Sequence, residues 1–141
     1  MQTPAQQQRF ETVMALIRIT TIVLGVYWLA LFVATHLPSQ SLPSMGSDKF
    51  YHVAAFGGLG FLLSWATALL VRNPAKQAVL VLLIAALYAS FDEWSQRFVV
   101  GRQPDVADFV ADVCGATLGL VCCMALRAIL PREASLADEV S

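Results

Sequence analysis

The sequence predicts an all-α, polytopic membrane protein in which four transmembrane helices form a compact bundle and both termini face the cytoplasm. Two features of the composition predict this class: 57% of the 141 residues are hydrophobic and only 13% are charged. Soluble domains usually carry about 25% charged residues, so this chain has more apolar surface than a soluble fold of its size can bury. The third observation is that the apolar residues form four long runs without the alternation typical of a β-strand.

The four runs account for most of the chain. The first covers about residues 16–34, the second about 50–71, the third about 78–91 and the fourth about 106–130. A membrane-spanning helix needs about 20 apolar residues, and only the third run is clearly shorter than this. Turn-forming segments separate the runs: HLPSQSLPSMGS, RNP and VGRQPD. These segments predict three connections between four helices.

The two ends of the chain differ from the rest in being polar. Residues 1–15 and 132–141 contain few large apolar side chains, and we expect them to need no fixed structure. The transmembrane domain is therefore predicted to cover residues 16–131.

The short third run predicts the depth of several charged groups. At about 1.5 Å per residue, Lys76 to Glu93 spans about 25 Å, less than the hydrocarbon core of about 30 Å. By the same arithmetic, Asp112 lies only about 22 Å from Arg127. We therefore expect the carboxylates to lie slightly below the outer headgroup level, unless the helices tilt or the bilayer thins.

The basic residues predict the orientation. Three of the nine, Lys49, Arg97 and Arg102, fall at the two junctions that four spans place on one face. The opposite face, with both termini, carries the other six: Arg9, Arg18, Arg72, Lys76, Arg127 and Arg132. Because basic residues are enriched on the cytoplasmic side, we expect the termini inside and the two junctions on the extracytoplasmic side.

Polar residues gather at these outer junctions, and we predict that they line one outward-facing ligand-binding pocket. The set is Asp48, Lys49, His52, Asp92, Glu93, Gln96, Arg97, Arg102, Asp105, Asp108 and Asp112. Spacing of i, i+3 and i+4 puts Glu93, Gln96 and Arg97 on one helix face, so Glu93 is expected to pair with Arg97. Six acids face three bases in this set, and the surplus must be neutralised by a proton, a bound cation or an amine-bearing ligand.

Glycines in the second and fourth runs predict close helix packing. The acidic stripe of the fourth run continues through Gly115 and Gly119, a small-xxx-small pattern that lets a neighbouring helix approach. Gly57 and Gly60 are expected to serve the same purpose in the second run.

Two stretches, DKFYHVAAFGGLGFLL (48–63) and ASFDEWSQRFVVGRQPDVADFVADVCGATLG (89–119), resemble the VanZ-like family of small bacterial membrane proteins. That family's pattern is Asp-Lys-x-x-His-x-x-x-Phe, then Asp-Glu-x-x-Gln and Gly-Arg, then an Asp followed by Asn and glycines. It falls here on Asp48, Lys49, His52, Phe56, Asp92, Glu93, Gln96, Gly101, Arg102, Asp108, Gly115 and Gly119. The chain departs from it at Val100, where the family often has Pro, and at Asp112, where it often has Asn. The first run and the tails carry no motif of the family.

The resemblance implies a multi-pass protein of the bacterial inner membrane that belongs to the cell envelope. The namesake is associated with low-level teicoplanin resistance, so the resemblance implies a link to antibiotic resistance of that kind. It implies no particular reaction.

The leading hypothesis is that the pocket binds or modulates an envelope component: a lipid headgroup, a wall precursor or a glycopeptide-type antibiotic. Arg97 and Arg102 suit phosphate or carboxylate groups because the guanidinium fork binds them bidentately. Membrane lipids are the expected partners, and the oligomeric state stays open. A formal net charge of −1 without any basic run gives no indication of nucleic-acid binding.

Two alternatives remain open at this stage. The first is a hydrolase or transferase acting on a lipid-linked substrate, with His52 and Glu93 as candidate general acid and base, or with Asp and His ligands holding a divalent cation. The chain has no nucleophile motif and no compact metal signature such as HExxH, so no metal ligand and no cofactor are assigned. The second alternative is a proton-coupled transporter, with Asp112 or Glu93 carrying the proton and two copies forming the pathway.

Overall fold

The computed structural model describes residues 3–37 and 48–130, with the backbone alone for Asp48. The described residues form four α-helices and no strand, which confirms the all-α class. The helices are α1 (Pro4–Thr35), α2 (Asp48–Ala68), α3 (Pro74–Gln96) and α4 (Val106–Ile129).

Capping residues explain where three of these helices begin. Thr3, Asn73 and Asp105 each stand just before a helix in extended conformation and accept a hydrogen bond from a backbone N–H group of its first turn. The first four N–H groups of a helix lack partners within it, so such caps stabilise the start. Proline follows the cap in α1 and α3, where its fixed φ suits the first helical position.

The expectation that residues 1–15 lack fixed structure is wrong for the described part, because α1 begins at Pro4. The cause is a capping box in which Thr3 and Gln6 satisfy each other's backbone N–H groups through their side chains. The predicted tail at 132–141 lies outside the described residues.

The third helix is longer than its apolar run. It contains 23 residues, about 35 Å at 1.5 Å per residue, which is enough to cross a hydrocarbon core without thinning it. The expectation of a short third span is therefore wrong, because polar residues at both ends of the run continue the helix. Asp92 and Glu93 lie on the last turns of α3, and the connection to α4 is confined to residues 97–105.

Three of the helices, α1, α3 and α4, are long and apolar enough to cross a membrane. The outward surface agrees with this, because large apolar side chains such as Ile22, Leu29, Leu87 and Val121 are exposed along these helices. In water, an exposed apolar surface this extensive would promote aggregation. The fourth helix, α2, has 21 residues and is not among the three.

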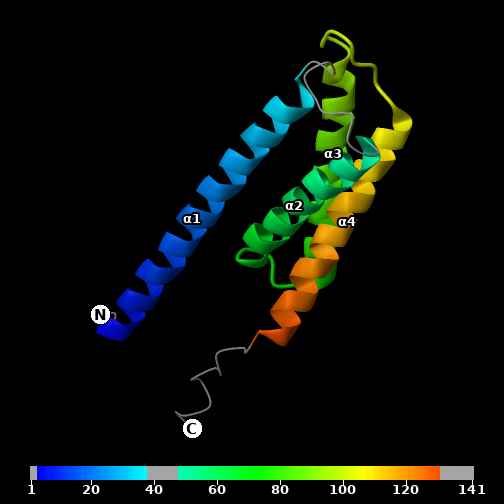
Figure 1. Ribbon diagram of the computed structural model, residues 1–141. Coiled ribbons are helices and arrows are strands. Elements are labelled where there is room, and N and C mark those ends of the chain that lie inside the picture. Colours follow the sequence, from blue (N-terminus) through cyan, green and yellow to red (C-terminus); the bar gives the residue numbers. More distant parts are fainter. Residues whose placement is uncertain (1–2, 38–47, 131–141) are drawn as a thin grey trace.

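Figure 1 shows α2, α3 and α4 side by side, whereas α1 meets them with its C-terminal half and diverges toward its N-terminus. The core lies where the helices meet. Phe56 stacks on Tyr88 at a centroid distance of 5.6 Å, and Trp28 meets the same ring edge-on at 5.0 Å. Leu31 is the one residue of α1 that is buried, so the compact part of the fold is the α2–α3–α4 unit.

The backbones of α2 and α4 touch at glycines. A Cβ atom on Gly60 would overlap the carbonyl oxygen of Ala116, and one on Gly119 would overlap that of Gly57. Gly115 likewise faces Val53, whose carbonyl carbon would be 3.0 Å from an added Cβ. Only residues without a side chain allow this approach, which brings the polar residues near the start of α2 against those near the start of α4.

Candidate functional site

Six polar residues from α2, α3 and the start of α4 meet at one end of the compact unit, and we call them the acidic cluster. They are Lys49, His52, Glu93, Asp105, Asp108 and Asp112. The alternating helix directions place the start of α2, the end of α3 and the start of α4 at the same end (Figure 1).

The exposed edge of the cluster is an ion-pair network. The Lys49 Nζ atom lies 2.8 Å from Asp108 Oδ1 and 3.1 Å from Asp105 Oδ2. Asp105 also caps α4 by accepting the N–H of Ala107 at 2.8 Å. These two contacts, the backbone bond first and the lysine second, hold the pKa of the Asp105 carboxyl below its usual value. The ion pairs of Lys49 tie α2 to the start of α4.

The interior of the cluster is built around His52, which is 6% exposed. Its Nδ1 atom lies 2.8 Å from Asp112 Oδ1, and its Nε2 atom lies 3.9 Å from Asp108 Oδ2. The close approach of α2 and α4 at Gly115 explains the first contact, because Gly115 lies one turn after Asp112 and faces Val53, the neighbour of His52.

Glu93 joins α3 to this pair. Its Oε2 atom accepts the backbone N–H of Asp105 at 2.8 Å, which fixes the connection between α3 and α4. Its other oxygen, Oε1, is buried and has no hydrogen-bond partner among the described residues, and the same holds for Asp112 Oδ2. Buried carboxylate oxygens without partners are costly, so the interior of the cluster is unsatisfied as it stands.

The three interior residues also form a potential donor set. One atom from each of His52, Glu93 and Asp112 lies within 4.8 Å of the other two, and all three residues are buried. No metal ligands were assigned from the sequence. The three donors come from three different helices, so they do not form a recognisable spacing within one segment. Chemically, the set offers one nitrogen and two oxygens for a cation, or an acid and a base in close reach.

A cavity opens beside the acidic cluster. It has a volume of about 260 Å³ and a mostly apolar surface, and Glu93 and Asp105 are among its lining residues. Its remaining lining residues are Ser90, Pro104, Val106 and Phe109. Val106 is 79% exposed, so the cavity is open at the surface beside the start of α4.

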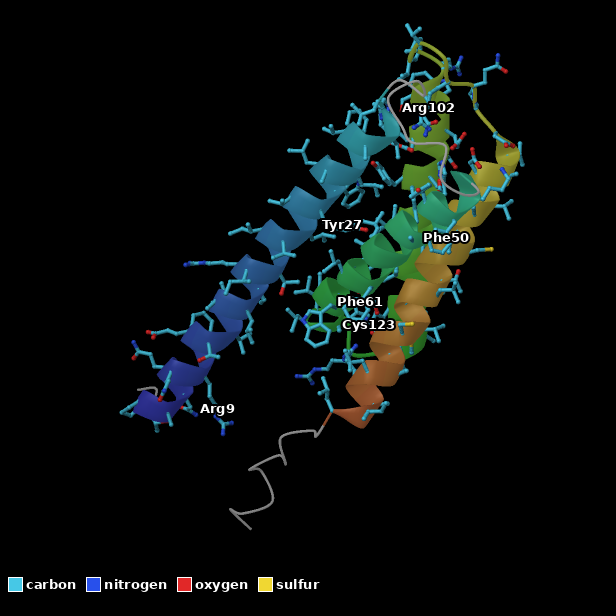
Figure 2. The ribbon with its side chains drawn as sticks, in the orientation of Figure 1. Arg9, Tyr27, Phe50, Phe61, Arg102 and Cys123 are labelled. Atoms are coloured by element: carbon cyan, nitrogen blue, oxygen red, sulfur yellow. The ribbon has the colours of Figure 1, made fainter. Side chains whose placement is uncertain are left out.

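Three of the predicted pocket residues lie apart from the acidic cluster, on the side of α3 that faces α1. Asp92 accepts Thr35 Oγ1 at 2.8 Å and Gln96 Nε2 at 2.9 Å. Arg102 donates from Nε to the carbonyl of Leu37 at 3.2 Å and reaches Gln96 Oε1 at 3.5 Å. Figure 2 places Arg102 at this end of the molecule. The single predicted pocket is therefore divided into two groups by α3.

The predicted pair of Glu93 with Arg97 does not form. Arg97 is the C-cap of α3 and donates from Nε to the carbonyl of Trp94 at 3.0 Å. Its guanidinium lies 4.8 Å from the Trp94 ring centroid. The last carbonyls of a helix lack partners within it. The hydrogen bond to the carbonyl of Trp94 directs the Arg97 side chain away from the pocket. The side chain of Asp48 lies outside the described residues.

Two further polar groups were not predicted from the sequence. His36 lies at the contact of α1 with α3, 2.9 Å from Ser95 Oγ; it stood in a predicted turn and carried no signal. At the opposite end of the bundle, the buried Gln77 donates to the carbonyl of Ser64 at 2.6 Å and accepts from Arg127 at 3.3 Å. A lone glutamine at the edge of an apolar run was the available signal for that group.

The long apolar helices define a helical membrane protein, and the acidic cluster at one end gives it a candidate site. Residues 2–127 match the VanZ/LLP1 family, so the chain belongs to that family and is a membrane protein of the VanZ type. This confirms the resemblance and extends it, because the match includes the first helix, in which we recognised no family motif. No curated protein and no solved structure matches the chain.

Proposed function

We propose that this protein lies in the bacterial inner membrane and binds the polar headgroup of an envelope component in the cavity beside the acidic cluster. The observation that carries the proposal is the lining of that cavity. Glu93 and Asp105 line it together with the apolar Val106 and Phe109. Such a surface suits an amphipathic ligand, whose polar part meets the carboxylates while its chains follow the exposed helix faces.

In the topology proposed from the sequence, this cavity lies on the extracytoplasmic face, with four spans and both termini in the cytoplasm. Basic residues support it: Arg9 and Arg102 lie at opposite ends of the molecule (Figure 2). The end that carries Arg9 also carries the α2–α3 connection with Arg72 and the end of α4 with Arg127 (Figure 1). Under the positive-inside rule, the end richer in arginine and lysine is cytoplasmic.

The charge balance favours a headgroup with an amine. The acidic cluster has four carboxylates, and Lys49, its one lysine, contacts only Asp105 and Asp108. A primary ammonium gains charge-assisted hydrogen bonds from carboxylates. The volume of about 260 Å³ lies below the range of about 300–1,000 Å³ typical of sites for drug-sized ligands. A lipid headgroup therefore fits whole, whereas a wall precursor or a glycopeptide would insert only one group.

The test is native mass spectrometry of the protein in a mild detergent with added phosphatidylethanolamine or phosphatidylglycerol. We expect wild type to retain the ethanolamine lipid preferentially. Asp105→Asn should weaken that retention about tenfold, since a hydrogen bond to a charged group contributes roughly 1.5–3 kcal/mol. Asparagine is also a good N-cap, so the variant should keep α4 intact.

The matched control is Arg97→Gln, which removes an exposed charge of the same junction that lies outside the cavity. Its lipid retention should equal that of wild type. Equal retention of the two lipids by wild type, or an Asp105→Asn variant that retains lipid as wild type does, would contradict the proposal. A wall precursor or glycopeptide that displaces the lipid in competition would identify the alternative ligand.

A further inference from the structure

The geometry points to a divalent transition-metal site formed by His52, Glu93 and Asp112 in the interior of the acidic cluster. One donor atom of each lies within 4.8 Å of the others. A tetrahedral ion with bonds of about 2.0–2.2 Å holds its ligand atoms about 3.3 Å apart. Small side-chain rotations therefore suffice to close the three donors around an ion.

The unsatisfied oxygens are the second and independent observation. Glu93 is 7% exposed and Asp112 is fully buried, and each has one oxygen without a hydrogen-bond partner among the described residues. Their other oxygens are already engaged, by the backbone N–H of Asp105 and by His52 Nδ1. A cation between the three side chains would satisfy both open oxygens and offset the charge of two buried carboxylates at once.

The donor types indicate the class of metal. An imidazole with two carboxylates suits Zn²⁺ or Mn²⁺, whereas Mg²⁺ and Ca²⁺ prefer sites made of oxygen alone. Three protein ligands leave a coordination position for water or for an oxygen of a bound molecule. Two contacts already in place would orient the ligands: the Asp105 N–H on Glu93, and Asp108, whose Oδ2 atom lies 3.9 Å from His52 Nε2.

This inference does not rest on the proposed headgroup. Glu93 belongs to both sites, but Asp105, Val106 and Phe109 line the cavity without supplying an atom to the donor set, and His52 and Asp112 do not line the cavity. The Asp105→Asn variant therefore tests the headgroup and the Asp112→Asn variant tests the metal, so failure of one proposal leaves the other standing.

The experiment is a metal titration of the full-length protein in detergent after removal of metals with a chelator. Zn²⁺ and Mn²⁺ are added separately, with Mg²⁺ for comparison, and the bound metal per chain is measured by calorimetry and elemental analysis. We expect one Zn²⁺ or Mn²⁺ per chain for wild type and much weaker binding of Mg²⁺. Asp112→Asn and Glu93→Gln should each lower the affinity at least about tenfold, in the range seen when metal-site residues are removed.

The matched control is Arg97→Gln, which removes a charge at the same junction that is outside the donor set and should bind metal as wild type does. A second readout needs no variant: Co²⁺ added to wild type should give the visible absorption bands of a coordinated ion with nitrogen and oxygen ligands. The inference is overturned if wild type binds neither Zn²⁺ nor Mn²⁺ stoichiometrically, which would leave a shared proton as the neutralising group. It is equally overturned if folded Asp112→Asn and Glu93→Gln variants bind metal with wild-type affinity.

Discussion

The contact of α2 with α4 and the contact of α1 with the rest of the molecule are built in different ways. Helices α2 and α4 meet backbone to backbone at Gly60, Gly115 and Gly119. Helix α1 reaches the others through side chains, chiefly the hydrogen bond of 2.7 Å from the Tyr27 hydroxyl to the carbonyl of Ala55. At the first contact, atoms added at these glycines would meet backbone, whereas at the second the side chain of Tyr27 lies directly over Gly58 of α2.

The backbone contact of α2 with α4 sets the geometry of the acidic cluster. His52 and Asp112 face each other across the glycine contact, so a shift of α4 against α2 would separate them. Helix α1 touches the α3 side through Thr35 and Asp92 but contributes nothing to the acidic cluster. The tight packing of α2 against α4 therefore positions the acidic cluster. Helix α1 instead contributes Thr35 to the separate polar group around Asp92.

The largest expected effect comes from adding one methyl group to the tight contact. In Gly119→Ala the new Cβ would overlap the carbonyl oxygen of Gly57 and lie 2.7 Å from the backbone nitrogen of Phe61. Backbone atoms cannot move aside cheaply, so we expect a loss of roughly 1–3 kcal/mol in unfolding free energy. Reversible unfolding in mixed detergent micelles measures it.

Gly57→Ala is the control for this variant, because its Cβ would stand at an ordinary 3.5 Å from the carbonyl oxygen of Gly115. It should unfold nearly as wild type does. If both variants lose the same stability, the backbone contact at Gly119 is not what holds α2 against α4.

A smaller effect is expected at the contact of α1 with α2. Tyr27→Phe removes the hydroxyl that donates to the carbonyl of Ala55, and a typical hydrogen bond contributes about 0.5–1.5 kcal/mol. We expect spin labels on α1 and α2 to report a broader distance distribution, with the acidic cluster unchanged. Thr21→Val serves as the control, because that hydroxyl bonds to Ile17 within α1 itself. An unchanged distance distribution for Tyr27→Phe would show that apolar packing alone positions α1.

The smallest effect is expected from the same Gly-to-Ala change in α1. Nothing lies within 4 Å of a Cβ added at Gly25, so Gly25→Ala gains helix propensity without a clash. The gain in stability should be at most about 1 kcal/mol, seen as a slightly higher unfolding midpoint. A clear loss of stability would mean that this face of α1 packs against another copy or another protein.

The sequence predicted much of the fold because its signals are local. Apolar runs and turn-forming segments report on neighbouring residues, and they predicted the all-α class and the approximate place of each helix. Where the boundaries differ, local polar residues extended the helix, as at Thr3 and Gln6 for α1 and at the end of α3. The glycine pattern also predicted close helix packing at Gly57, Gly60, Gly115 and Gly119, and all four lie at the α2–α4 contact.

The site was less predictable, because helix geometry separates neighbours in sequence. Asp92 and Glu93 are adjacent but point about 100° apart on α3, so one meets Thr35 of α1 and the other meets the start of α4. Spacing along one helix suggested that Glu93 pairs with Arg97, but that residue caps the helix end and turns to Trp94. Counting positions within a segment cannot show which neighbouring helix a side chain meets.

The class of this protein, its family and the end at which its charges gather can be read from the amino-acid sequence. That His52, Glu93 and Asp112 come together, while Asp92, Gln96 and Arg102 form another group, becomes visible only in the folded chain. Apolar length and capping act within one helix. The meeting of three donors from three helices depends instead on how closely the backbones of α2 and α4 approach.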